Sequence, residues 1–215
     1  MLTRKWQFSG TPDQRDLLKL PDHKVNLTEK GKKQAEDSGS GITNEIKPDI
    51  IITSGYARTI QTLAGIKSTS NAWDKIPVKE DLMIRERETG YTWSMLDTPH
   101  HEVFPFLPEY WQQHGNFLAR PVGGHSILDM IESRLYRFIE KMGKKYAGKK
   151  VCLVAHGRVV AALRFVLEDM TLEEAEDLVD RNSHNGGPKN VGLTVYRYNP
   201  WSGRLELAFY NKTFY

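Results

Sequence analysis

The sequence predicts an α/β fold, a three-layer α/β/α sandwich with a mostly parallel central sheet, and two observations support that prediction. The stretches "III" (50–52) and "VCLVA" (151–155) are unbroken apolar runs, which is typical of parallel strands covered on both faces. Each run leads into a segment whose apolar residues recur at helical spacing. Because strands and helices alternate through the middle of the chain, we expect helices on both sides of one sheet.

The first two helices are expected on either side of the first apolar run. Thr28 is expected to cap a helix in "LTEKGKKQAEDSG", in which Gly31 lowers the helix propensity. A second helix is expected directly after the run, with its apolar residues facing the core. These inward-facing residues are Ala57, Ile60, Leu63 and Ala64.

Two later helices carry the signature of a capping box. Ser126, with Asp129 three residues on, is expected to open the longest helix of the chain, and Gly143 is expected to end it. Thr171 and Glu174 have the same spacing and predict the start of another helix.

The two ends of the chain and one internal segment complete the expected layout. Met1–Lys5 is expected as a short strand, and "VGLTVYRY" and "RLELAFYN" as an antiparallel hairpin around the turn "NPWSG". Residues 91–122 are rich in aromatics and proline and long for a loop, so we expect a lid-like insertion there. Residues 1–215 are expected to form a single domain.

The composition narrows the class of protein. A net charge of +3 is too mild for a nucleic-acid-binding surface. The single cysteine, Cys152, excludes an internal disulfide and favours a reducing compartment. The N-terminal "MLTRKWQ" has no apolar signal stretch, and no segment approaches the roughly 20 apolar residues of a membrane span. We therefore expect a soluble, cytoplasmic protein.

Residues able to bind phosphate are predicted to gather at one edge of the sheet. His156 follows the second apolar run and stands where a helix begins, a position that binds anions in open α/β sheets. Arg58 lies in the first turn after the first run, and Arg4 near the end of the first expected strand. Glu86 lies in the charged stretch "IRERETG". Arginine forks match phosphate oxygens and a carboxylic acid can protonate a leaving alkoxide, so this set predicts a phosphate pocket with a proton donor.

The alternative interpretation of these residues is structural. At a strand end, a polar side chain is often held by a neighbouring carboxylate, and a glutamate in a charged run is often a solvated surface residue. We favour the anion pocket for Arg4, Arg58 and His156, and favour a functional Glu86 by a smaller margin.

Five stretches in the right order resemble motifs of the histidine phosphatase superfamily, the phosphoglycerate-mutase-like group. They are "LTEKGKKQA", "SGYARTIQTLA", "IRERETG", "GGHS" and "AHG", and together they span nearly the whole chain. The resemblance implies a phosphoglycerate-mutase-like fold. It also implies that Glu86 is the proton donor and His156 the second catalytic histidine, with Arg58, Arg87 and Gly157 on phosphate- or substrate-binding positions.

The N-terminal motif of that family departs from the pattern in this chain. The family's "RHGxSxGN" corresponds to "RKWQFSGT" (4–11), in which Arg4 is retained. Lys5 stands where the nucleophilic histidine belongs, and Trp6 replaces a glycine. Phe8 replaces a serine, and Thr11 takes the place of a phosphate-site asparagine. The later motifs keep their register, so the change is a substitution within the loop.

Lys5 decides the chemistry that the resemblance implies. Free lysine stays protonated up to about pH 10, and an ammonium has no lone pair with which to attack phosphorus. Two interpretations stay open for Lys5: a solvated lysine near the N-terminus, or a residue that contacts phosphate. In the second case neighbouring arginines and burial would lower its pKa, and an N-phospholysine intermediate could form.

The sequence therefore predicts a protein that binds a small phosphorylated compound, with weak or absent conventional phosphatase activity because Lys5 replaces histidine. The alternative is an active, metal-independent phosphatase or phosphoglycerate-mutase-like enzyme with altered chemistry on a small phosphomonoester. We expect no cofactor and no metal, because the spacing of His100, His101 and His114 fits no ligand pattern. The expected partner is a small phosphorylated molecule or inorganic phosphate, not nucleic acid or membrane, and a homodimer stays open.

Overall fold

The computed structural model describes residues 20–90, 103–180 and 187–215. The strand expected at Met1–Lys5 and the first part of the expected insertion, 91–102, lie outside the described residues.

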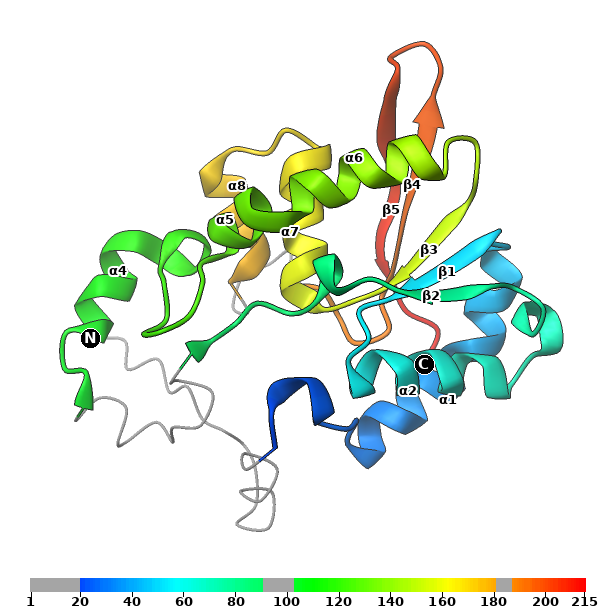
Figure 1. The fold of residues 1–215 in the computed structure, drawn as a ribbon, viewed down its shortest axis with the longest axis horizontal. Helices are drawn as coiled ribbons and strands as arrows, with labels where there is room; N and C mark the ends of the chain where they lie inside the picture. The colour runs from blue at the N-terminus through cyan, green and yellow to red at the C-terminus, as the bar shows by residue number, and fades with distance from the viewer. Residues whose placement is uncertain (1–19, 91–102, 181–186) are drawn as a thin grey trace.

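A three-stranded parallel sheet lies at the centre of the described chain (Figure 1). Its strands follow the order β2 (Val78–Glu80), β1 (Ile50–Thr53), β3 (Val151–Val154). All four residues of β1 are buried, whereas β2 is an exposed edge strand. Only Val154 of β3 is buried and the other three residues are half-buried. Val151 and Leu153 pack against one apolar cluster, and Cys152 and Val154 against the other, so both faces of β3 are covered as the sequence predicts. Among the described strands, β3 pairs with β1 alone.

Helices cover both faces of this sheet, as the sequence predicts. The alternation of side chains along β1 shows the two layers, because Ile50 and Ile52 pack into one apolar cluster and Ile51 into another. In Figure 1, α1 (Glu29–Glu45) and α2 (Ala57–Ser68) lie on one side of the sheet. On the other side lie α6 (Tyr136–Lys145) and α7 (Gly157–Leu167), which confirms the three-layer α/β/α arrangement.

The first two helices pack directly on each other. Thr28 caps α1 by accepting a hydrogen bond from the Gly31 backbone N–H at 3.1 Å, as expected. The inward face predicted for α2 was partly wrong, because Ile60 is 44% exposed and Ala64 is exposed too. The buried stripe of α2 instead includes Thr59, Leu63 and Ile66, which follow one another at helical spacing.

The longest helical stretch is divided by a π-helical turn. It runs through α5 (Ile127–Met130), η6 (Ile131–Leu135) and α6. Ser126 and Asp129 form the expected capping box. Gly143 does not end the helix, because α6 continues to Lys145 and the left-handed turn falls at Gly148, with φ of 73°. A helical glycine with open space around it is tolerated, so it need not mark a terminus.

The described part of the expected insertion contains one helix, α4 (Leu107–Leu118), which breaks at Gly115. The carboxylate of Glu176, from α8 (Leu172–Val179), accepts hydrogen bonds from the backbone N–H groups of Asn116 at 2.6 Å and Phe117 at 2.8 Å. Helix α8 begins at Thr171 with the predicted capping box. The last part of α4 is therefore anchored to the scaffold.

The C-terminal strands form the predicted antiparallel hairpin, β4 (Leu193–Asn199) and β5 (Arg204–Lys212). Glu168, at the end of α7, accepts two hydrogen bonds of 2.7 Å from Arg164 and one from the Tyr196 hydroxyl. The Arg164 guanidinium also stacks 4.0 Å from the centre of the Tyr210 ring. These contacts attach the hairpin to α7. Within the described ranges, no helix is long and apolar enough to cross a membrane.

Candidate active site

The strand ends bring two polar residues together at the carboxyl edge of the sheet. β1 and β3 run parallel with Thr53 opposite Val154, so the residues that follow them leave the sheet side by side. Ser54 directly follows β1 and His156 is the second residue after β3, and the Ser54 Oγ lies 2.8 Å from the His156 Nε2. His156 occupies the N-cap position of α7 without a side-chain capping hydrogen bond, and it is only 6% exposed.

A directional chain of hydrogen bonds assigns the tautomer of His156. The Nε–H of Arg58 donates to His156 Nδ1 at 3.2 Å, so Nδ1 is the acceptor. Nε2 then carries the ring proton and donates it to the Ser54 hydroxyl. Ser54 in turn donates to the Thr59 hydroxyl at 3.0 Å, and Thr59 donates to the Tyr56 carbonyl at 2.9 Å. The imidazole is therefore neutral, with both nitrogens engaged.

The surroundings of His156 favour the same neutral state. Burial, together with the positive charges of Arg58 and Arg134, lowers the pKa of His156 to about 3. The ring of Tyr56 packs edge-on against the imidazole, with the ring centres 5.1 Å apart. An imidazole held in this way accepts hydrogen bonds and can take up a proton only when its environment changes.

Arg58 is held between His156 and a carboxylate from the segment before α1. This segment contains the short 3₁₀ helix η2 (Asp22–Lys24). Arg58 Nη1 donates to the backbone carbonyl and to Oδ1 of Asp22, both at 2.8 Å, and Nη2 donates to Oδ2 at 3.3 Å. The guanidinium also lies 4.8 Å from the centre of the Tyr56 ring. Sequence analysis did not identify Asp22, although it lies just before the "LTEKGKKQA" motif.

Glu86 lies near the Nδ1 edge of the His156 ring. Its Oε2 is 4.0 Å from His156 Nδ1, and its Oε1 accepts a hydrogen bond from the Arg87 backbone N–H at 2.8 Å. Burial raises the pKa of Glu86 above its ordinary value. A carboxyl group with a raised pKa next to a histidine is suited to carry a proton.

The segment that presents Glu86 is held by Arg134 from the π-helical turn. Arg134 Nη1 donates to the carbonyls of Met83 at 2.6 Å and Arg85 at 2.7 Å, and Nη2 donates to the carbonyl of Glu86 at 3.1 Å. These carbonyls belong to η4 (Leu82–Ile84) and to the two residues after it, so one buried side chain fixes the path of the loop. No local sequence pattern signals this role, because the contacts join residues 48 to 51 positions apart.

Arg87 is buried beside this group with part of its guanidinium unused. It is 7% exposed, and its Nε and Nη1 have no hydrogen-bond partner among the described residues. Its guanidinium lies 5.9 Å from the centre of the Trp111 ring, which belongs to α4. Burial lowers the pKa of Arg87 to about 10, and the neighbouring charge of Arg158 acts in the same direction.

The structure thus brings together three of the expected site residues, Arg58, Glu86 and His156. Arg87 follows Glu86 directly, and Gly157 is the first residue of α7. The other expected residues, Arg4, Lys5 and Thr11, lie outside the described residues. The residues that sequence analysis missed are Asp22, Ser54, Tyr56, Thr59 and Arg134.

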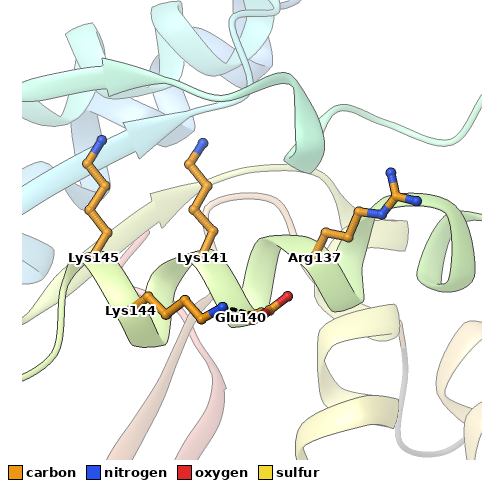
Figure 2. A pocket seen from close by; sticks show the side chains of 5 residues that line it. All are labelled: Arg137, Glu140, Lys141, Lys144 and Lys145. Carbon is orange, nitrogen blue, oxygen red and sulfur yellow. Dashed lines mark hydrogen bonds and ion pairs between the residues drawn. The ribbon is translucent and has the colours of Figure 1, made fainter.

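A separate hollow of about 490 Å³ lies on the surface of α6 (Figure 2). Figure 2 shows Arg137, Lys141 and Lys145 extending to the same side of this helix. Lys141 is paired with Asp81 at 2.6 Å, and Lys144 with Glu140. None of its lining residues belongs to the group at the strand ends, so we place the candidate active site at His156 and not in this hollow.

The fold and the site define the class of protein. A parallel sheet lies between two helical layers, with a histidine and an arginine after its strand ends and a glutamate in the loop after η4, which agrees with the resemblance of the sequence motifs. The family model described as histidine phosphatase superfamily (branch 1) matches residues 18–208, and the chain belongs to this superfamily.

Curated relatives include several phosphoglycerate mutases. A 2,3-bisphosphoglycerate-dependent phosphoglycerate mutase of Rhizobium etli is 27% identical over 172 residues, which cover 78% of this chain and 75% of that protein. A second enzyme of this description, from Gloeobacter violaceus, is 30% identical over 154 residues, covering 71% of this chain and 68% of that protein. The relatives are thus phosphatase- and mutase-like.

Solved structures share the fold at low sequence identity. A mycobacterial glucosyl-3-phosphoglycerate phosphatase in complex with inorganic phosphate matches with a TM-score of 0.70 and 21% identity, covering 90% of each chain. The α-ribazole phosphatase of Shigella flexneri matches with a TM-score of 0.71 and 17% identity, covering 90% of this chain and 88% of that one.

Proposed function

We propose that this protein binds a small phosphorylated compound, or inorganic phosphate, at the His156 site and has weak or absent conventional phosphatase activity. The observation that carries the proposal is the contact between Arg58 and the neutral His156 at the carboxyl edge of the sheet. This edge is where open α/β sheets bind their ligands.

Three further features support an anion as the ligand. The guanidinium of Arg87 is buried with two unpartnered nitrogens among the described residues, and a phosphate or carboxylate oxygen would satisfy them. Helix α7 begins at Gly157, directly after His156, without a side-chain cap, and its N-terminus attracts negative charge. Solved relatives of this fold hold inorganic phosphate or VO₃.

The proposal of weak turnover depends on the N-terminal segment. In "RKWQFSGT" the residue aligned with the nucleophilic histidine is Lys5, and the bulky Trp6 follows it. A protonated amine cannot attack phosphorus, and Glu86 and His156 can only assist a nucleophile that is present. The family match begins at residue 18, after this stretch, which is consistent with a motif that has diverged.

The second candidate is an active, metal-independent phosphatase or mutase acting on a small phosphomonoester. The observation in its favour is the position of Glu86, whose Oε2 lies 4.0 Å from His156 Nδ1. Burial raises the pKa of Glu86, so this carboxyl group could protonate a leaving alkoxide. Turnover that depends on Lys5 would favour this candidate.

We also propose that residues 1–215 form one domain and that residues 91–122 are an insertion that covers the site as a lid. The contact of Trp111 with Arg87 supports a position of this insertion near the site. The hydrogen bond from Phe117 to Glu176 attaches the end of α4 to α8 and supports a fixed hinge at that end of the insertion. A cytoplasmic location is proposed from the single Cys152, which allows no internal disulfide.

The anion site is tested by titrating inorganic phosphate into the protein at low salt in a calorimeter. We expect weak but measurable binding to the wild type and a loss of about tenfold or more in affinity for Arg58→Ala, because charge-assisted hydrogen bonds to phosphate would be lost. The matched control is Arg204→Ala, since Arg204 is 72% exposed and pairs only with Asp169 among the described residues. Binding that is absent, or unchanged by Arg58→Ala, would contradict the proposal.

A further inference from the structure

Arg58 is already occupied by an anionic group of the protein itself. From its contacts we infer that Asp22 is an internal competitor for the ligand: its carboxylate takes the Arg58 donors that a phosphate would use, and the anion binds by displacing it. This inference rests on the proposed function, because it concerns how the same site admits its ligand.

The donor count of Arg58 shows why the two anions compete. A guanidinium has five N–H donors. In Arg58 the Nε–H donates to His156 Nδ1, and the two N–H groups of Nη1 donate to the backbone carbonyl and to Oδ1 of Asp22. One N–H of Nη2 donates to Asp22 Oδ2. Bidentate binding of phosphate needs two donors on one edge, and only one of the five is left. A phosphate therefore cannot bind Arg58 by two hydrogen bonds while Asp22 stays in place.

The carboxylate stands on a segment that is suited to move. η2 is three residues long, buries none of them and has no side-chain cap. The Asp22 side chain is 26% exposed and that of Arg58 is 21% exposed, so water already reaches the ion pair. An ion pair that is partly exposed contributes little net stability, and a dianion that brings more charge can replace it.

A second contact keeps the displaced segment attached to the protein. Gln61, one turn after Arg58 on α2, accepts a hydrogen bond from the Leu27 backbone N–H at 2.8 Å and donates to the Asn26 side chain at 2.8 Å. These bonds hold the chain between η2 and α1. Asp22 can therefore leave Arg58 by a change confined to the few residues before Asn26.

This competition makes the site selective for the charge of the ligand. Without ligand, the carboxylate of Asp22 neutralises the charge of Arg58 next to the neutral His156. When a dianionic phosphate or phosphomonoester displaces Asp22, Arg58 gains a partner with two negative charges and more acceptor oxygens. A monocarboxylate would only replace one carboxylate with another of the same charge. The ligand class that the exchange favours is the phosphate dianion.

The test compares the wild type with Asp22→Asn in calorimetric titrations with inorganic phosphate at fixed pH and ionic strength. We expect Asp22→Asn to bind phosphate about fivefold more tightly, the factor that corresponds to a partly exposed ion pair. Asp169→Asn is the matched control, because it removes an exposed aspartate that pairs with Arg204. Its phosphate affinity should equal that of the wild type.

Hydrogen exchange of the wild type gives a second readout that needs no variant. Phosphate should increase amide exchange in residues 20–25, because the segment loses its contact with Arg58, and should leave the segment around Leu27 unchanged. Protection of residues 20–25 by phosphate would overturn the inference.

The possible results separate this inference from the proposed function. If phosphate binds the wild type but binds Asp22→Asn equally or less tightly, the competition is refuted and the anion site stands, with Asp22 acting as a positioning residue for Arg58. If phosphate binds neither protein, both the anion site and the competition are refuted. Should Asp22→Asn fail to fold, the exchange experiment on the wild type decides alone.

Discussion

Both ring nitrogens of His156 are engaged, one by the Arg58 guanidinium and the other by the Ser54 hydroxyl. A neutral histidine beside an arginine is stable only where burial disfavours the imidazolium, and here the side chain is almost fully enclosed. The hydrogen bonds that hold the ring in place therefore also disfavour its protonation. The geometry of the site is thus connected with the pH dependence of the protein's stability.

The pH dependence of stability should reveal this neutral state. The pKa of His156 is about 3 in the folded protein and about 6.5 when unfolded, so between these values the unfolded chain binds a proton that the folded protein does not. The free energy of unfolding contributed by His156 is thus fully present above pH 6.5 and falls as the pH drops towards 3. The raised pKa of Glu86 acts in the opposite sense, with its contribution lost as the pH rises above the ordinary value.

Urea unfolding of the wild type and of His156→Gln from about pH 7.5 to about pH 4 isolates the contribution of His156 to the free energy of unfolding. We expect the wild type to lose stability faster on acidification, by on the order of 1 kcal/mol per pH unit below about pH 6. Above about pH 7 the two curves should run parallel, which serves as the internal control. Parallel curves over the whole range would show that His156 is not held neutral.

At the scale of the elements, the site is built from strand ends but is oriented by irregular segments. The π-helical turn Ile131–Leu135 carries Arg134, whose guanidinium binds three carbonyls of the loop that presents Glu86. π-helical turns are rare and occur frequently at functional sites. The break of α4 at Gly115 is the second such feature, because it lets Glu176 cap the last part of the helix.

Two glycine substitutions on helices should act in opposite directions. Gly115 has φ of 70° and ψ of −176°, which is a conformation essentially restricted to glycine, and an added Cβ would lie 2.7 Å from Glu176 Oε2. Gly115→Ala should destabilise the protein by about 1–3 kcal/mol. Gly143 lies within α6 with nothing within 4 Å of an added Cβ, so Gly143→Ala should stabilise the protein by about 0.5–1 kcal/mol. Thermal unfolding of both variants measures the effects, and a neutral Gly115→Ala would contradict the assigned role of the break.

The features that could be predicted from the sequence are those that local chemistry determines. The caps at Thr28, Ser126 and Thr171 each depend on residues three positions apart, and all three are present. The continuation of α6 beyond Gly143 was not predicted, because the space around a glycine depends on the tertiary structure. The exposure of Ile60 could not be predicted either, since the inward face of α2 is set by its packing on α1.

The same distinction holds for the site. Arg58, Glu86 and His156 lie in motifs that mark strand ends, and the structure brings them together. Asp22 contacts Arg58 across 36 positions and Arg134 contacts Met83 across 51, and no local pattern signals either contact. The pairing of a carboxylate with a distant arginine can be identified only from the three-dimensional arrangement of the two chain segments.

At the scale of the whole molecule, the candidate site lies at the carboxyl edge of the parallel sheet, between the two layers of helices. β1 and β3 supply adjacent strand ends, α7 supplies a helix N-terminus, and the loop held by Arg134 supplies a carboxyl group. The chain belongs to the histidine phosphatase superfamily and shares the fold of enzymes that act on phosphate esters. The proposal of weak turnover depends on the stretch Arg4-Lys5-Trp6, which the sequence motifs place at the position of the family's histidine nucleophile.

The most direct test of this account is the turnover of p-nitrophenyl phosphate from about pH 5 to about pH 9 by four proteins. These are the wild type, His156→Ala, Lys5→Ala, and a variant that combines Lys5→His with Trp6→Gly, Phe8→Ser and Thr11→Asn. We predict weak turnover by the wild type and a clear gain in the combined variant, because a neutral imidazole then has the space to attack phosphorus. Strong wild-type turnover that disappears in Lys5→Ala would contradict the account and identify Lys5 as the nucleophile, and strong turnover lost only in His156→Ala would assign that role to His156.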